Sequence, residues 1–441
     1  MTDRGAGGAF AARTIRLGVA RLVTLAALFA VSVLAARALD TEQVGAVAVG
    51  QTVGLFAAML ANGGLNISTV YFLRRRADDR GALVGALTAM AIGSALLAVV
   101  LALVAAPIVF ATVLERPDWG LLAAAALVGA GIIGFEFAGA LLLGIDRPGA
   151  FTLIELVRGL GALAATVVGL LLMREAWIVV AAVGAGSVAA AVGGLRAASA
   201  TVRPRVHLDV DLARRSLGFG LRGQAGNVFQ YLGLRLDLLL VPAIVGLHAG
   251  GIYFVVVRVA EVVGQIATAA ASFLFPDVAG AADRGSTLTT ERATRMTLLL
   301  VIVAALAVGI VAGPLLGFVF GPAYASGAPV LLIALAAMVP LSLCRMIASD
   351  LKGRGRPGLA SLGSAVMAAG IVVLDLALIP PWGLIGAAVA SLAAYGLSAV
   401  ALLAAYRHVT GAHLGALVPG LADAQAGLAF AGHALRRRRA A

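Results

Sequence analysis

The sequence predicts an all-α integral membrane protein with about twelve transmembrane helices arranged as two lobes of six. The 441 residues are 61% hydrophobic and only 12% charged, with a mean hydropathy of +1.03. About a quarter of the residues in a soluble domain are charged. Apolar windows of roughly 17 to 25 residues, long enough to cross a bilayer, recur along the chain. Basic residues gather in alternate breaks between these windows.

The predicted spans follow one another with short breaks. The first six lie near 14–38, 43–72, 81–114, 119–143, 150–173 and 177–199, and the second six near 217–245, 251–275, 296–319, 328–348, 359–379 and 384–406. The first window follows Arg13, Arg16 and Arg21, and the small residues Ala35 and Ala36 resemble the cleavage site of a secretory signal peptide. Because apolar windows continue along the chain, we interpret this window as the first span.

Charge predicts the orientation. One set of alternate breaks carries groups such as Arg74–Arg76, Arg214 with Arg215, and Arg354 with Arg356. The other set is nearly bare, and its breaks near 246–250, 320–327 and 380–383 hold no basic residue. An even number of spans and the positive-inside rule place both termini in the cytoplasm. The strong preference for arginine over lysine suggests a GC-rich bacterium, so we expect the bacterial plasma (inner) membrane.

Several classes of function are disfavoured by what the sequence lacks. The net charge of +12 comes from short breaks between apolar runs, which argues against a nucleic-acid partner. The single cysteine, Cys344, excludes an internal disulfide, and the five histidines show no metal-ligand spacing. No catalytic triad, phosphate-binding loop or nucleotide fingerprint is present. We therefore predict no metal, no cofactor, no direct use of ATP and no enzymatic activity.

An internal duplication is the strongest long-range pattern. The turn Gly144–Gly149 reads Gly-x-x-Arg-Pro-Gly, and Gly353–Gly358 repeats it 209 positions later (353 minus 144). Three further landmarks recur at nearly the same offset: Gly45 with Gly251, Pro117 with Pro322, and Trp177 with Trp382. The motif alone also has a local explanation, because proline and glycine suit turns. Together the landmarks predict a parallel repeat whose two lobes face a central cavity and rock to give alternating access.

The predicted domains follow from this duplication. Residues 1–199 form an N-lobe with spans one to six, and residues 217–406 form a C-lobe with spans seven to twelve. Residues 200–216 form a basic cytoplasmic linker between them. Residues 407–441 form a cytoplasmic tail, where Arg436–Arg439 are expected to lie on anionic lipids.

Short motifs at the predicted span boundaries resemble those of a known family. They are an Arg-x-Leu turn in Ala36–Gly45, Arg235–Asp237 followed by Gly250–Tyr253, Phe320–Tyr324 after span nine, and Gly383–Ala390 at the start of span twelve. In this order they resemble the polysaccharide flippases of the multidrug/oligosaccharidyl-lipid/polysaccharide (MOP) exporter superfamily, over residues 14–406. The break after span two lacks the ordered motif of the major facilitators, which also have two six-span halves.

This resemblance implies a V-shaped bundle like that of the multidrug MATE exporters. It implies a flippase that moves polyprenyl-diphosphate-linked oligosaccharide from the inner to the outer leaflet for cell-surface polysaccharide synthesis, with glycosyltransferases or a polymerase as further partners. The alternative on the same fold is a MATE-type proton- or sodium-coupled antiporter of small molecules or drugs. A third class is a membrane scaffold for a synthase complex.

Polar side chains inside spans are the candidate functional residues. A charge at the centre of a membrane helix costs roughly 2.5 to 3.5 kcal/mol on insertion scales, so retained charges are expected to serve a function or to have a partner. The candidates for the substrate cavity are Arg21, Arg158, Arg235, Arg258, Asn62, Asn66, Asn227 and Gln230, and those for ion coupling are Glu136 and Asp237.

Each set of candidates also has a structural interpretation. Arg158 follows Glu155, and Glu261 follows Arg258, at i, i+3, so each pair can neutralise itself within one helix. The amides can act as hydrogen bonds between helices. Asp375 lies near the outer end of its span, where snorkelling lowers the cost of burial.

Overall fold

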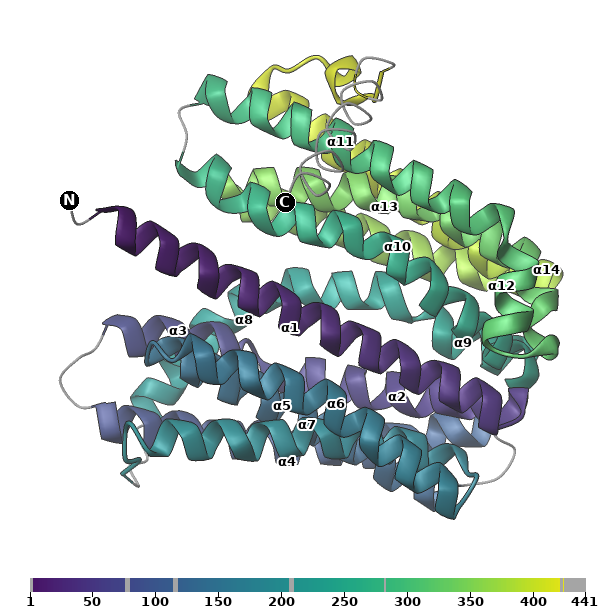
Figure 1. Ribbon diagram of the computed structural model, residues 1–441, viewed down its shortest axis with the longest axis horizontal. Helices are drawn as coiled ribbons and strands as arrows, with labels where there is room; N and C mark the ends of the chain where they lie inside the picture. Colours follow the sequence, from purple (N-terminus) through teal and green to yellow (C-terminus); the bar gives the residue numbers. More distant parts are fainter. Residues whose placement is uncertain are drawn as a thin grey trace, which may run out of the picture. The chain divides into compact units, whose positions relative to one another are not determined.

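The structure, a computed structural model, describes residues 3–75, 80–113, 118–205, 210–280, 283–420 and 423 (Figure 1). Within these residues the regular elements are α-helices and two short 3-10 helices, with no strand. Residues 206–209 of the predicted linker, Pro117 and the tail arginines Arg436–Arg439 lie outside the described residues. The all-α class predicted from the sequence is therefore confirmed.

The described residues contain 11 helices that are long and apolar enough to cross a membrane. One of them, α14 (Pro357–Thr410), has 54 residues, far more than one crossing requires. It is broken at Gly383, whose φ of 54° and ψ of −130° are not helical. Pro380 and Pro381 precede this break. Counting its two halves separately gives the twelve predicted spans of a multi-pass membrane protein.

The chain forms two compact units. The first contains residues 1–228 and 246–254, and the second contains residues 229–245 and 255–441. Helix α8 (Val210–Arg235) and helix α10 (Leu247–Gly280) contribute residues to both. The remaining helices of the first unit are α1 (Asp3–Ala38), α2 (Thr41–Asn62), α3 (Leu65–Arg75), α4 (Arg80–Val113), α5 (Trp119–Gly144), α6 (Pro148–Leu172) and α7 (Ala176–Ser199).

The second unit contains the rest of the helices. It contains α9 (Asp237–Val245), α11 (Asp283–Ile310), α12 (Ala312–Val319), η1 (Pro322–Gly327), α13 (Ala328–Gly353), α14 and η2 (Leu414–Leu417). Helix α13 packs along α14 and α11, and α9 packs on α14. Three aspartates are buried in this unit: Asp237 of α9, Asp350 of α13 and Asp375 of α14.

Glycines allow the helices of the first unit to approach closely. Helix α7 packs between α5 and α6. A Cβ atom on Gly131 of α5 would lie 2.8 Å from the carbonyl oxygen of Gly184 in α7. Where α2 and α10 begin, a Cβ on Gly45 would overlap the carbonyl of Leu247, and a Cβ on Gly251 would overlap that of Thr41. Small residues at such crossings permit the backbone contact that drives helix association in membranes.

The two Gly-x-x-Arg-Pro-Gly turns have the same backbone hydrogen bonds. In each turn three consecutive backbone amides donate to backbone carbonyls of the preceding helix. In the first turn the bonds run from Ile145 to Leu141, from Asp146 to Leu143 and from Arg147 to Leu142. In the second they run from Arg354 to Asp350, from Gly355 to Lys352 and from Arg356 to Leu351. The middle residue of each turn is left-handed, with φ of 59° at Asp146 and 73° at Gly355. Proline then begins the next helix in both, as its fixed φ favours. The duplicated sequence thus encodes a duplicated turn.

Candidate functional site

A glutamate in the second unit holds two arginines. Glu261 of α10 accepts from Arg235 Nη1 at 2.7 Å and from Arg258 Nη1 at 3.3 Å, using a different carboxylate oxygen for each. The three side chains are only 20% to 27% exposed. The predicted i, i+3 pair of Arg258 with Glu261 is therefore present. The partner of Arg235 lies on a different helix, and no pattern within α8 could have shown it.

Arg345 of α13 adds a third cation beside this pair. Its Nη1 donates to the carbonyl oxygen of Gly264 at 2.6 Å, and its charge interacts with that of Glu261. Sequence reasoning missed Arg345 because it lies near the predicted cytoplasmic end of span ten, although it falls within the apolar window. We call Arg235, Arg258, Glu261 and Arg345 the arginine cluster. Three arginines and one glutamate make it cationic.

Two aspartates of the second unit lie within electrostatic reach of each other. Asp237 begins α9, is 4% exposed and accepts the amide of Leu238 at 2.8 Å. Asp375 of α14 is fully buried, and neither of its carboxylate oxygens has a hydrogen-bond donor among the described residues. The charge of Asp237 acts on Asp375. The snorkelling expected of Asp375 is wrong: the side chain points into the protein, where a buried anion requires a counter-charge or a proton.

In the first unit, Glu136 of α5 meets the amides predicted in span two. Asn62 Nδ2 donates to Glu136 Oε2, and Asn66 Nδ2 lies 3.4 Å from the same oxygen. Helix α2 ends at Asn62, and the left-handed Gly63 and Gly64 separate it from α3. Asn62 Oδ1 accepts the amide of Leu65 at 3.0 Å and so caps α3. The helix break thus places both amides on one carboxylate.

Glu155 of α6 forms a second charged group in this unit. Arg158 Nη2 lies 3.4 Å from Glu155, as the i, i+3 spacing predicts, and Arg21 Nε of α1 lies 3.9 Å away. The guanidinium of Arg158 stacks on the ring of Phe135 at 4.6 Å, and its charge also acts on Glu136. Arg158 therefore connects the two carboxylates, whereas the side chain of Arg21 is 56% exposed.

Helix α8 carries three amide side chains, those of Gln224, Asn227 and Gln230. Asn227 donates to Gln224 at 3.2 Å, and Gln224 in turn lies 3.4 Å from the carbonyl of Met59 in α2. This chain is a polar link between two helices, the structural interpretation of such amides. Gln230 is half-buried on the same helix. Among the described residues, no group of three or more histidine, cysteine, aspartate or glutamate residues is arranged to hold a metal ion.

Comparison with solved structures shows the fold. The chain is similar to a multidrug resistance MATE family transporter of the MOP superfamily in an inward-facing conformation, with a TM-score of 0.67 and 13% identity over 90% of this chain and 98% of that one. It is similar to the lipid II flippase MurJ in an inward closed conformation, with a TM-score of 0.68 and 10% identity over 90% and 87% of the two chains. A MOP superfamily transporter from Pyrococcus furiosus gives a TM-score of 0.59 and 14% identity over 90% and 95%.

Sequence comparison shows the family. No curated protein sequence matches the chain significantly. A family model described as polysaccharide biosynthesis protein matches residues 10–280, which is more than half of the chain. The match includes the first unit from residue 10 onward and the α8–α10 region that supplies Arg235, Arg258 and Glu261. The chain therefore belongs to the polysaccharide biosynthesis protein family and has the fold of the MOP superfamily transporters.

Proposed function

We propose that the protein is a flippase, not an enzyme, that moves a polyprenyl-diphosphate-linked oligosaccharide from the inner to the outer leaflet of the plasma membrane. Translocation would occur by alternating access and would serve cell-surface polysaccharide synthesis. The observation that carries this proposal, beside the family, is the arginine cluster, in which Glu261 pairs with Arg235 and Arg258 and interacts electrostatically with Arg345. Guanidinium groups bind phosphate oxygens in a planar fork. A cationic group within membrane-spanning helices suits a diphosphate.

Other partners follow from this role. Glycosyltransferases that build the glycan, or a polymerase that consumes it, would act before and after translocation. Anionic lipids would contact the basic tail at Arg436–Arg439. These partners are part of the proposal.

We assign ion coupling to Asp237 and Asp375, with Glu136 as a second candidate. The oxygens of Asp375 have no donor among the described residues, so a proton or a sodium ion would remove the cost of burying its charge. Glu136 already accepts from two asparagines. Asp375→Asn is expected to abolish the dependence of transport on pH or sodium, whereas Glu42→Gln, an exposed change in α2, is expected to leave it intact. Unaltered ion dependence in the Asp375 variant would remove this assignment.

A MATE-type antiporter of cationic small molecules is the second candidate function. The observation that favours it is also Asp375, because a buried carboxylate without a donor suits a cationic cargo as well as a coupling ion. The two candidates differ in the group that contacts the substrate: the arginine cluster for a diphosphate and Asp375 for a cation.

The deciding experiment is transport in liposomes with a labelled polyprenyl-diphosphate oligosaccharide, scored by an impermeant probe of the sugar. Arg258→Ala is the test variant, because Glu261 still pairs with Arg235 at 2.7 Å and is not left without a partner. Arg407→Ala, an exposed change in the last turn of α14, is the control. The flippase is supported if the parent protein and the Arg407 variant expose the sugar on the far side of the membrane and the Arg258 variant does not. Absence of exposure, together with extrusion of a cationic dye down a proton or sodium gradient, supports the antiporter.

A further inference from the structure

A polar cavity lies within the second unit at the end that carries the second Gly-x-x-Arg-Pro-Gly turn. Its volume is about 800 Å³, within the range of small-molecule sites. The polar residues that line it are Ser286 and Thr287 of α11, Arg354 and Arg356 of the turn, and Thr410 at the end of α14. This end is the one that the charge pattern predicts to be cytoplasmic. The cavity is separate from the arginine cluster.

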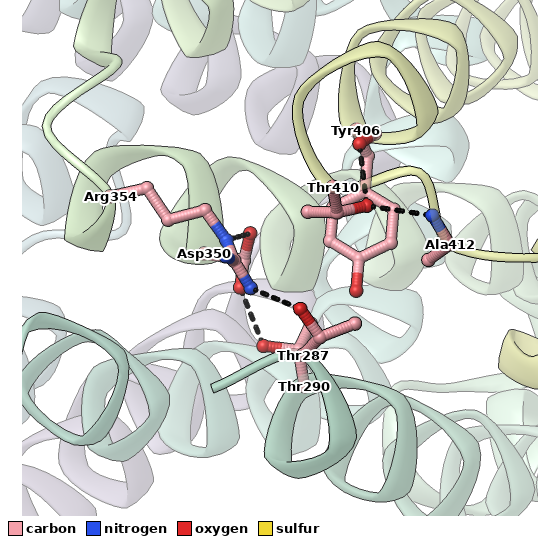
Figure 2. A network of polar contacts seen from close by, with 7 residues as sticks. All are labelled: Thr287, Thr290, Asp350, Arg354, Tyr406, Thr410 and Ala412. Carbon is pink, nitrogen blue, oxygen red and sulfur yellow. Dashed lines mark hydrogen bonds and ion pairs between the residues drawn. The ribbon is translucent and has the colours of Figure 1, made fainter. Parts of the chain in front are cut away.

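Arg354 is held in the wall of this cavity by two hydrogen bonds. Asp350, fully buried, accepts from Arg354 Nε at 2.7 Å and from Thr290 Oγ1 at 2.6 Å. Arg354 Nη2 donates to Thr287 Oγ1 at 3.0 Å, as Figure 2 shows. Among the described residues, no acceptor meets the third nitrogen, Nη1. The guanidinium is thus oriented in advance and keeps donor capacity for a ligand.

Two further groups near the cavity lack partners. Arg356 is exposed and pairs with no described residue. The hydroxyl of Tyr406 is buried without a hydrogen-bond partner among the described residues, although the residue is fully enclosed. In Figure 2 this hydroxyl is at the end of the ring nearest Thr287. A buried donor without an acceptor is costly unless something binds it.

The first turn shows that this polar cluster is not needed to form the turn. With the same backbone hydrogen bonds, it has Leu141 where the second turn has Asp350, and Ile145 where the second has Arg354. Leu141 is buried in an apolar cluster, and Ile145 packs against it. Apolar packing is therefore sufficient for the turn, and the ion pair is specific to the second unit.

We propose that this cavity binds a phosphate group, with Arg354 and Arg356 as the principal donors. Arg354 and Arg356 against the single carboxylate of Asp350 leave a net positive charge, and Ser286, Thr287 and Thr410, which carry hydroxyls, line the same space. Arginine is suited to bidentate contact with phosphate oxygens. The phosphate belongs either to the headgroup of an anionic phospholipid in the inner leaflet or to a soluble phosphate compound. This site does not depend on the proposed flippase activity.

The test is direct binding to the full-length protein in a neutral detergent. The probes are short-chain phosphatidylglycerol, diacylglycerol with the same acyl chains, and inorganic phosphate, the last used alone and as a competitor. Two variants remove the site: Arg356→Ala, an exposed change, and Asp350→Leu combined with Arg354→Ile, which copies the first turn. Arg147→Ala changes the residue equivalent to Arg356 in the first unit and serves as the control.

We expect phosphatidylglycerol to bind and diacylglycerol to bind weakly, with about tenfold loss of affinity in both site variants, the effect of one charge-assisted hydrogen bond. The Arg147 variant should bind like the parent. Competition by inorganic phosphate, lost in the same variants, would identify a soluble ligand at the same site. Equal binding of the two lipids without phosphate binding, or binding unchanged in Arg356→Ala, overturns the proposal. If the double variant does not fold, the result with Arg356→Ala alone tests the proposal.

Discussion

Most of the charged residues discussed above lie beside an opposite charge or a polar group. Glu261 pairs with both Arg235 and Arg258, and Glu155 pairs with Arg158. Such pairs are weak contributors when intact, but they are costly to break, since removal of one partner leaves a buried charge. Asp375 differs, because its oxygens have no hydrogen-bond donor among the described residues. Asp375 therefore differs from the paired charges, and it is the residue that we propose for ion binding.

Glu261→Gln is expected to destabilise the protein by roughly 3 kcal/mol, because it removes the carboxylate that pairs with Arg235 and Arg258 and leaves these two cations close to each other. The measurement is the midpoint of thermal unfolding in detergent. Glu175→Gln, an exposed change before α7, controls for the loss of one carboxylate. Equal midpoints for the two variants would mean that the cluster is not a structural unit.

Asp423 is predicted to make the docking of the tail sensitive to pH. Its carboxylate accepts the amide of Gly420 at 2.9 Å and lies 3.1 Å from Arg295 Nε, while Arg295 Nη1 donates to the carbonyl of Ala416 at 2.7 Å. The hydrogen bond from Gly420, followed by that from Arg295, lowers the pKa of Asp423. Because the pKa is lowered in the folded state, the contact contributes stability above the ordinary aspartate pKa of about 3.9 and loses it as the pH falls through the lowered value.

Hydrogen exchange of residues 411–423, corrected for the intrinsic effect of pH, measures this docking. Protection should be constant from neutral pH down to about 4 and then decrease. Asp423→Asn should show, at every pH, the low protection that the parent shows only in acid. Protection in the variant equal to that of the parent at neutral pH would show that Asp423 does not hold the tail.

At the scale of elements, breaks in helices decide where functional side chains lie. Gly63 and Gly64 end α2 and place Asn62 and Asn66 on Glu136. The break at Gly383 divides α14 into two spans, of which the first carries Asp375. Left-handed backbone is open to glycine and unfavourable by about 1 to 2 kcal/mol for most other residues. These glycines are therefore part of the architecture of the site.

Gly63 and Gly64 provide a matched pair of substitutions. A Cβ on Gly63 would meet only the side chain of Leu217, at 3.4 Å, whereas a Cβ on Gly64 would overlap the backbone of Gly220. Gly63→Asn is expected to cost about 1 kcal/mol or less, because asparagine tolerates left-handed backbone. Gly64→Asn adds a clash with main chain and should lower the unfolding midpoint much further. Similar midpoints in the two variants would contradict the close crossing of α2 or α3 with α8.

At the scale of the whole molecule, the alternation of charge predicts which loops face the cytoplasm. Cys344 is the only cysteine in the sequence and is buried, so Cys344→Ala gives a background without thiols. In that background we expect Ser326→Cys, in η1, to react with an impermeant maleimide in intact cells. Gly358→Cys, after the second turn, should react only after lysis. The opposite pattern would reverse the predicted orientation, and reaction of both sites in intact cells would contradict it.

The sequence determined the all-α membrane class, the twelve spans, the duplicated turn and the family motifs. It did so because apolar length, loop charge and glycine-proline turns are local properties that the bilayer and the backbone impose directly. It also predicted the intrahelical pairs of Arg158 and Arg258, which depend only on spacing within one helix. These features would have been the same however the helices packed.

Only the tertiary structure decided which charges meet across helices. Arg235 pairs with Glu261, Arg345 joins them from α13, and Asp375 is buried instead of reaching the lipid headgroups. The polar contacts of the second Gly-x-x-Arg-Pro-Gly turn also depend on helix packing, because Arg354 has one partner on the preceding helix and one on α11. Contacts between residues distant in sequence depend on how helices pack and rotate, which hydropathy and charge along one chain do not specify.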